Sequence, residues 1–142
     1  MKIILFGKNG QIARRLYGQL IVLGEVVLCG SEDIDFRNRV KLKEFVEHHG
    51  PDIIINAAAY TEVDNAESNK DKAFAVNADA VKILAEVAKK IDALLVHYST
   101  EYVFDGKKQL GYTEADSMSP LNVYGASKAM ADEYISSIDP KH

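Results

Sequence analysis

The chain has 142 residues, of which 47% are hydrophobic and 27% charged, which predicts one folded domain with an ordinary core. Its net charge of −4 argues against a nucleic-acid-binding surface, and its single cysteine excludes an internal disulfide and suits a reducing compartment. No apolar run approaches the roughly 20 residues of a membrane span, and the first residues are typical of a strand rather than a leader peptide. We therefore expect a cytoplasmic protein without a membrane partner.

Short apolar runs alternate with amphipathic stretches along the chain. The apolar runs predict four strands, at residues 3–6, 26–29, 53–55 and 93–98. The helical periodicity predicts helices from residue 11 to a stop at Gly24, and over 40–49, 71–90 and 122–137. In the third of these helices, Val81, Leu84 and Ala88 share the expected core face. Residues 105–121 are predicted to form a long loop, and such loops are often functional.

This alternation predicts an α/β fold with a Rossmann-type, doubly wound parallel sheet. Right-handed crossovers favour the strand order 3-2-1-4. Folds of this class usually continue with further strands, so we expect residues 1–142 to be an incomplete Rossmann domain, truncated after its last helix. The fourth strand would then be an open edge. Either the chain is a fragment, or a partner such as a second copy in a homo-oligomer covers that edge.

A glycine-containing turn follows the first predicted strand and opens a helix. Gly7 and Gly10 have the spacing G-x-x-G-x-x-A, which ends at Ala13. Glycines allow a tight turn and a close approach to a pyrophosphate, and the helix N-terminus offers N–H groups and a positive dipole end. The turn therefore predicts a phosphate site, although a tight strand-to-helix turn without a ligand has the same pattern.

Tyr124 and Lys128 lie four residues apart on the last predicted helix and so share a face. A nearby ammonium lowers the pKa of a tyrosine, which suits proton donation to a carbonyl oxygen as a hydride arrives at its carbon. Thr100, just after the fourth strand, could bond the same oxygen. The alternatives are an accidental surface pair and a hydroxyl that caps local backbone. The groups together indicate catalysis more strongly than any one of them.

The end of the second strand leaves the choice between NAD and NADP open. An acid often binds the ribose there, but Gly30 stands near this position and the acids follow it. No arginine follows immediately to hold a 2′-phosphate, and Arg37 and Arg39 could be solvated. The four histidines show no metal-ligand spacing, so we predict no metal, and we expect His97 to be a hydrogen-bonded core residue.

Together these residues resemble the dTDP-4-dehydrorhamnose reductase family of the extended short-chain dehydrogenase/reductase superfamily. The stretches that carry the resemblance are Leu5–Gln11, Asn56–Thr61, Val63–Asp64, Ala66–Glu67, Tyr98–Phe104 and Ser119–Lys128. The resemblance spans the whole chain. It implies reduction of the 4-keto group of a dTDP-4-keto-6-deoxy sugar with NADPH or NADH, which would belong to dTDP-L-rhamnose synthesis.

The resemblance also implies roles for individual residues. Thr100, Tyr124 and Lys128 would be catalytic, and Thr100 and Glu101 would bind the nucleotide-sugar substrate. The implied cofactor-binding residues are Gly7, Asn9, Gly10, Gln11, Ile12, Asp35, Phe36, Ala59, Tyr60, Thr61, Tyr98, Tyr124 and Lys128. No catalytic role is expected for Asp64 or Glu67.

The chain departs from the family pattern at several positions. Glu101 replaces an aspartate, Ala13 replaces the third glycine, and Arg15 stands where some members carry a glutamate tied to metal-assisted dimerisation. The family also has about as much chain again, with most of the nucleotide-sugar site. The alternatives are therefore a non-catalytic cofactor-binding or regulatory protein of the same fold, and a truncated, inactive reductase. An epimerase or dehydratase would share the Tyr-x-x-x-Lys pattern, but the stretch Ser99–Phe104 is more typical of the reductase.

Overall fold

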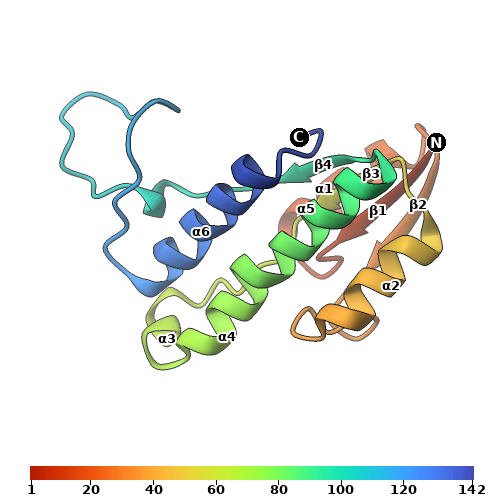
Figure 1. The fold of residues 1–142 in the computed structure, drawn as a ribbon, viewed down its shortest axis with the longest axis horizontal. Coiled ribbons are helices and arrows are strands. Elements are labelled where there is room, and N and C mark those ends of the chain that lie inside the picture. The colour runs from red at the N-terminus through yellow and green to blue at the C-terminus, as the bar shows by residue number, and fades with distance from the viewer.

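A four-stranded parallel sheet runs through the computed structural model, which describes residues 1–142 (Figure 1). Its strands are β1 (Lys2–Phe6), β2 (Glu25–Cys29), β3 (Ile53–Asn56) and β4 (Leu94–His97). The helices are α1 (Gln11–Leu20), α2 (Arg39–His49), α3 (Val63–Ser68), α4 (Lys70–Phe74), α5 (Ala80–Ile91) and α6 (Val123–Ile138), with a π-helical turn η1 (Ala75–Asp79) and a 3₁₀ turn η2 (Glu101–Val103). The predicted α/β class is confirmed.

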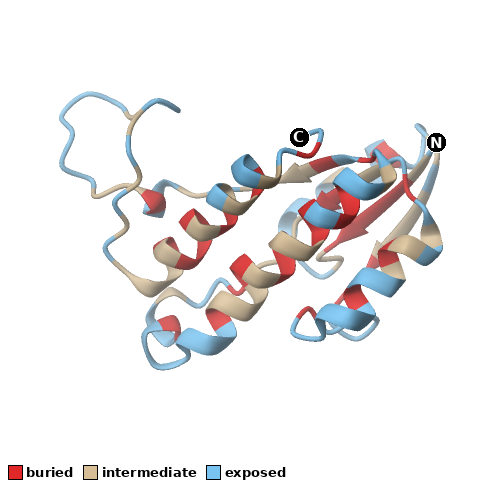
Figure 2. Cartoon of the chain, viewed as in Figure 1, coloured by how far each residue is buried: buried red, intermediate tan, exposed pale blue.

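Helices cover both faces of the sheet. Ile4 and Phe6 of β1 join the core beneath α2, α5 and α6, whereas Ile3 and Leu5 join the core beneath α1. All four side chains are fully buried, as a parallel sheet covered on both faces requires. Figure 2 shows the buried positions of α5 and α6 on one side of each helix and exposed positions on the other. The predicted core residues Val81, Leu84 and Ala88 of α5 are all fully buried.

The predicted strand order is wrong, because the observed order is β2-β1-β3-β4. The third strand pairs with β1, with Ile3 opposite Ile53, and not with β2. Right-handedness fixes the hand of each crossover but not the edge at which the next strand joins. Here the chain reverses direction after β2, so α2 crosses on the face opposite α1. The doubly wound class therefore holds, and the reversal lies between β1 and β3.

Two predicted helices differ from the observed helices by more than one residue at an end or by an interruption. The first ends at Leu20 rather than at Gly24, because the chain turns there to enter β2; a Cβ on Gly24 would lie only 2.1 Å from the Met1 carbonyl oxygen. The helix predicted over 71–90 is α4 and α5 joined by the π-helical turn η1. Asn77 in η1 is buried and hydrogen-bonded to the backbone of Tyr60. Such π-helical turns are frequent at functional sites.

The fourth strand lies at an edge, as expected. It pairs with β3 on one side, and on the other only Leu94 forms a bridge, a parallel one with Lys141. The predicted loop at 105–121 extends away from the sheet and is mostly exposed (Figures 1 and 2). None of the helices combines the length and the apolar run that crossing a bilayer requires.

Candidate functional site

The carboxyl ends of all four strands meet at one edge of the sheet, where open α/β folds bind their ligands. Gly7, Gly30, Ala57 and Tyr98 are the first residues after β1, β2, β3 and β4. The order of the strands reverses between β1 and β3, which makes the gap between Gly7 and Ala57 the expected crevice for a ligand.

The turn after β1 has room only for glycine. Gly7 has a φ of +88°, and a Cβ there would lie 2.6 Å from the Ala57 carbonyl oxygen. A Cβ on Gly10 would lie 3.1 Å from the Gly7 carbonyl oxygen, and the Gly10 N–H donates to that oxygen at 2.8 Å. No side chain caps α1, and its first turn contains no acid. The first N–H groups of α1 are thus available to an anion.

A groove of about 500 Å³ lies between this turn, the end of β2 and the segment after β3. It brings together seven of the predicted cofactor residues: Gly7, Asn9, Gly10, Asp35, Phe36, Ala59 and Thr61. Gln11 and Ile12 are exposed at the start of α1 outside the groove lining, and Tyr60 is buried behind it. Lys72 of α4 also lines the groove; the sequence does not single it out, because one lysine on an amphipathic helix carries no signal of a ligand.

Charged residues at the end of β2 are paired with one another. The Lys8 ammonium contacts Asp33 at 2.7 Å and Glu32 at 2.8 Å, and the Asp33 bond contributes most to raising the pKa of Lys8. The Arg37 guanidinium binds both oxygens of Asp35 and holds the pKa of that carboxyl below its usual value. Both cations near the expected ribose position are therefore already matched by carboxylates.

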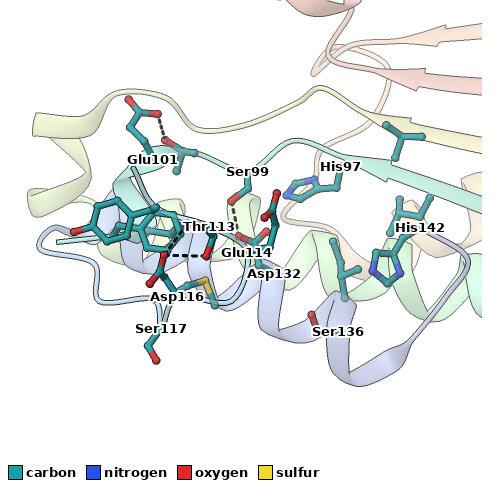
Figure 3. Close-up of a pocket in the computed structure, with 18 residues that line it drawn as sticks. His97, Ser99, Glu101, Thr113, Glu114, Asp116, Ser117, Asp132, Ser136 and His142 are labelled. Atoms are coloured by element: carbon teal, nitrogen blue, oxygen red, sulfur yellow. Dashed lines mark hydrogen bonds between the residues drawn. The ribbon is translucent and has the colours of Figure 1, made fainter. Parts of the chain in front are cut away.

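Thr100 and Glu101 lie beside a second, larger cavity of about 930 Å³, between the end of β4, α6 and the loop that contains Thr113 and Asp116 (Figure 3). The Thr100 hydroxyl donates to Glu101 at 3.1 Å and accepts from the Tyr102 N–H at 3.3 Å. The local capping role considered for Thr100 is thus present. It does not prevent the hydroxyl from facing a ligand, because both residues line the cavity.

Tyr124 is half-buried near the start of α6, next to η2. Its ring packs edge-on against that of Tyr102, with 5.6 Å between centroids. Gly125 permits the close approach, since a Cβ there would lie 2.2 Å from the Tyr102 carbonyl oxygen. Burial raises the pKa of Tyr124 above its ordinary value of 10, and the Thr100 hydroxyl acts in the opposite direction. The phenol therefore holds its proton at neutral pH.

Lys128 does not lower the pKa of Tyr124 in this arrangement, contrary to the expectation from their spacing. Its side chain is buried, and its Nζ donates to the Tyr98 carbonyl oxygen at 2.5 Å and lies 3.0 Å from His97 Nε2. Burial lowers the pKa of Lys128 to about 8. His97 is hydrogen-bonded, as predicted, but it is half-buried and lines the larger cavity rather than lying in the core. Its other ring nitrogen lies 3.2 Å from Asn56 Nδ2.

Several contacts around these residues were not foreseen. The Ser99 hydroxyl donates to Asp132, one turn beyond Lys128 on α6 (Figure 3). Glu67 accepts the Val123 N–H at 2.8 Å, a capping contact that agrees with the absence of a predicted catalytic role. The spacing of Lys128 and Asp132 on one helix face is visible in the sequence, but the contact with Ser99 depends on how α6 packs beside β4.

The groove fits a dinucleotide. The turn after β1 passes so close to the backbone of Ala57 that only glycine fits at position 7. The uncapped N-terminus of α1 faces the groove, and the groove continues toward the end of β2. The candidate catalytic residues lie at the same edge of the sheet, beyond the end of β4: Thr100, Tyr124 and Lys128. The fold and this edge define the class: a Rossmann-type α/β domain with a Tyr-x-x-x-Lys helix.

The whole chain, residues 1–142, matches the family model of the RmlD substrate binding domain, and the chain belongs to this family. A dTDP-4-dehydrorhamnose reductase of Burkholderia thailandensis is 46% identical over 132 residues, which are 93% of this chain and 44% of that protein.

Solved structures agree with this assignment. A dTDP-4-dehydrorhamnose reductase of Clostridium acetobutylicum superposes with a TM-score of 0.95 and 36% identity, covering 99% of this chain and 51% of that one. The Bacillus anthracis dTDP-4-dehydrorhamnose reductase, solved in complex with NADP, gives a TM-score of 0.91 and 33% identity, covering 96% of this chain and 49% of that one. The chain spans about half the length of the curated relatives it matches.

Proposed function

We propose that this chain is the cofactor-binding part of an NAD(P)H-dependent reductase that reduces the 4-keto group of a dTDP-4-keto-6-deoxy sugar. The observation that carries the proposal is that Thr100, Tyr124 and Lys128 lie at the same edge of the sheet as the glycine turn. The relatives named above are dTDP-4-dehydrorhamnose reductases, and one of them was solved with NADP.

The proposed cofactor residues divide between the ends of the groove. The turn from Gly7 to Ile12 would hold the pyrophosphate, and Asp35 and Phe36 would lie at the adenine. Ala59, Tyr60, Thr61 and Tyr98 would line the remainder. A bound nicotinamide supplies the hydride for the reduction.

The chain's own residues supply the proton and its placement. Tyr124 would donate its phenolic proton to the carbonyl oxygen as that carbon is reduced, so that the ketone becomes an alcohol. A raised pKa suits this direction of the reaction, because the donor must hold its proton beforehand. Thr100 would bond the same carbonyl oxygen, Glu101 would contact the sugar, and Lys128 would orient the site from its buried position.

The second proposal is a non-catalytic cofactor-binding or regulatory protein of the same fold, or a truncated reductase that is inactive. It is favoured by one observation: the chain spans about half of each relative, so groups that complete a sugar site would have to come from outside residues 1–142. For the same reason we propose that either further chain of the same protein or a second copy covers the open edge of β4.

We also propose that the protein is cytoplasmic. Cys29 is the one cysteine, it is buried, and burial raises its pKa to about 11. A free, unpaired cysteine is typical of proteins in a reducing compartment, which supports the proposed cytoplasmic location.

The function is tested by supplying the protein that carries this chain with NADPH or NADH and a dTDP-4-keto-6-deoxy sugar. We expect the nicotinamide absorbance to fall only when the sugar is present, with equimolar formation of the 4-hydroxy product. Tight cofactor binding without any consumption of the cofactor would favour the binding protein.

A further inference from the structure

Asp132 links the last helix to the segment that follows β4. It lies one turn after Lys128 on α6, and its half-buried carboxylate accepts a hydrogen bond from the Ser99 hydroxyl (Figure 3). Both Ser99 and Asp132 line the larger cavity. The contact therefore lies in the wall of the cavity that Thr100 and Glu101 also line.

Ser99 is the middle residue of a short segment with a candidate functional group on each side. The carbonyl oxygen of Tyr98 accepts from Lys128 Nζ at 2.5 Å, and Thr100 carries the hydroxyl proposed to bond the substrate carbonyl. Residues 98–100 belong to no helix or strand. A side-chain hydrogen bond at Ser99 therefore restrains the backbone that sets the position of both groups.

Lys128 needs a counter-charge at this position. It is only 3% exposed, and the two groups in contact with its Nζ, the Tyr98 carbonyl and the His97 imidazole, carry no negative charge. A buried ammonium without a negative charge nearby is unstable relative to the neutral amine. Residues four apart share a helix face, so the Asp132 carboxylate lies on the side of α6 that carries Lys128.

We propose that Asp132 is a positioning residue of the reductase site: its carboxylate anchors the Ser99 segment and is the counter-charge that keeps Lys128 an ammonium. An ammonium has three N–H donors, of which the Tyr98 carbonyl and His97 engage at most two. A third donor remains for a hydroxyl of the cofactor, and a neutral amine would have one donor fewer. The proposal deepens the proposed function, on which its catalytic significance rests.

The charges of these side chains act on one another as the arrangement requires. Burial lowers the pKa of Lys128 to about 8, and the Asp132 carboxylate opposes that shift. Burial raises the pKa of Asp132, whereas the Ser99 hydroxyl and then the charge of Lys128 act in the opposite direction. Burial, and then the charge of Lys128, lowers the pKa of His97 to about 3, so the imidazole is neutral. The negative charge that Lys128 requires therefore comes from Asp132.

Other charged groups on the elements around α6 contact partners of their own. Those partners are the Val123 N–H for Glu67, Thr100 for Glu101, the Tyr60 ring for Lys72, Arg39 for Asp79, the Tyr134 ring for Lys82, the Ile138 carbonyl for Lys89 and Lys108 for Asp116, while Glu114 and His142 line the same cavity. Asp132 is the carboxylate whose charge raises the pKa of Lys128.

The first test is made on the wild-type protein that carries this chain, by NMR with ¹³C-labelled lysine and aspartate. The Cε resonance of Lys128 reports its titration, and the Cγ resonance of Asp132 reports the field at the carboxylate. We expect both resonances to shift with one common midpoint as Lys128 loses its proton, because the two groups are coupled. An Asp132 resonance that ignores the titration of Lys128 would overturn the proposal.

Asp132→Asn separates the charge from the hydrogen bond, because the amide oxygen still accepts from Ser99. The pKa of Lys128 should fall by roughly one unit. From a pKa of about 8, the charged fraction of Lys128 at pH 8 would fall from about one half to about one tenth. Reduction should therefore slow about fivefold at pH 8 and change little at pH 6. An unchanged pKa of Lys128 in this variant would contradict the counter-charge.

Ser99→Ala makes the opposite change, since it removes the bond and keeps the charge. It should leave the pKa of Lys128 in place and slow reduction equally at pH 6 and pH 8. A wild-type rate in this variant would contradict the anchor. Glu133→Gln is the matched control, because it removes the same charge from the next, exposed residue of α6 and should change neither the pKa of Lys128 nor the rate. The wild-type titration decides the question even where a variant fails to fold.

The NMR measurements need neither cofactor nor turnover. A reductase assay that fails while Lys128 and Asp132 titrate together would reject the proposed function alone. An active reductase in which Asp132→Asn leaves the pKa of Lys128 unchanged would reject the role of Asp132 alone.

Discussion

Replacement of Tyr124 by phenylalanine is expected to slow reduction by at least about 100-fold in the protein that carries this chain, because a positioned general acid contributes roughly 10²–10⁴. The change removes one oxygen and keeps the ring that packs against Tyr102. The cofactor dissociation constant should therefore change little. The rate is measured from nicotinamide absorbance at saturating substrate, and the affinity from fluorescence.

Tyr102→Phe is the matched control for this prediction. Its ring meets that of Tyr124 edge-on, and no role in the reaction is assigned to its hydroxyl. This variant should keep a rate close to that of the wild type. A Tyr124→Phe protein that turns over as fast as Tyr102→Phe would reject Tyr124 as the proton donor.

Gly7→Ala is expected to destabilise the fold by about 2–6 kcal/mol, from a left-handed backbone strain of about 1–3 kcal/mol and an overpacking cost of similar size. The new Cβ would lie 2.6 Å from the Ala57 carbonyl oxygen at a φ of +88°. Because the turn must also shift, NADPH affinity should fall more than about tenfold, equivalent to about 1.4 kcal/mol. Urea unfolding and a fluorescence titration measure the two effects.

Gly18→Ala separates this steric effect from the general effect of replacing a glycine. Gly18 lies inside α1, and a Cβ there meets nothing within 4 Å. Alanine should stabilise the helix by about 0.5–1 kcal/mol and leave cofactor affinity unchanged. Equal NADPH affinity in the two variants would contradict a phosphate-binding role for the turn at Gly7.

Local sequence patterns predicted most of the fold, because each depends on residues close in the chain. The apolar run at β1 and the core face of α5 follow from periodicity and burial alone. The strand order could not be predicted in this way, because the hydrophobic pattern of residues 53–55 suits a position beside either β1 or β2. The π-helical turn η1 was equally hidden, because the contacts of Asn77 with Tyr60 join distant residues.

In the candidate site, too, the features set by neighbouring residues could be predicted from the sequence, and the contacts between distant residues could not. The glycine turn and the Tyr124–Lys128 spacing are local patterns, and the sequence indicates both. The partners of Lys128 could not be inferred, because Asn56, His97 and Lys128 belong to three separate elements and meet only in the folded structure. The raised pKa of Tyr124 likewise depends on burial beside η2, which its spacing from Lys128 does not reveal.

Titration of the purified 142-residue chain with NADPH and with NADH, followed by nicotinamide fluorescence, tests whether residues 1–142 bind a nicotinamide cofactor. The groove at the glycine turn predicts saturable binding at about micromolar concentrations, weakened in Gly7→Ala, and the ratio of the two affinities decides the preferred cofactor. A chain that melts cooperatively and yet binds neither nucleotide would contradict a cofactor-binding role for residues 1–142.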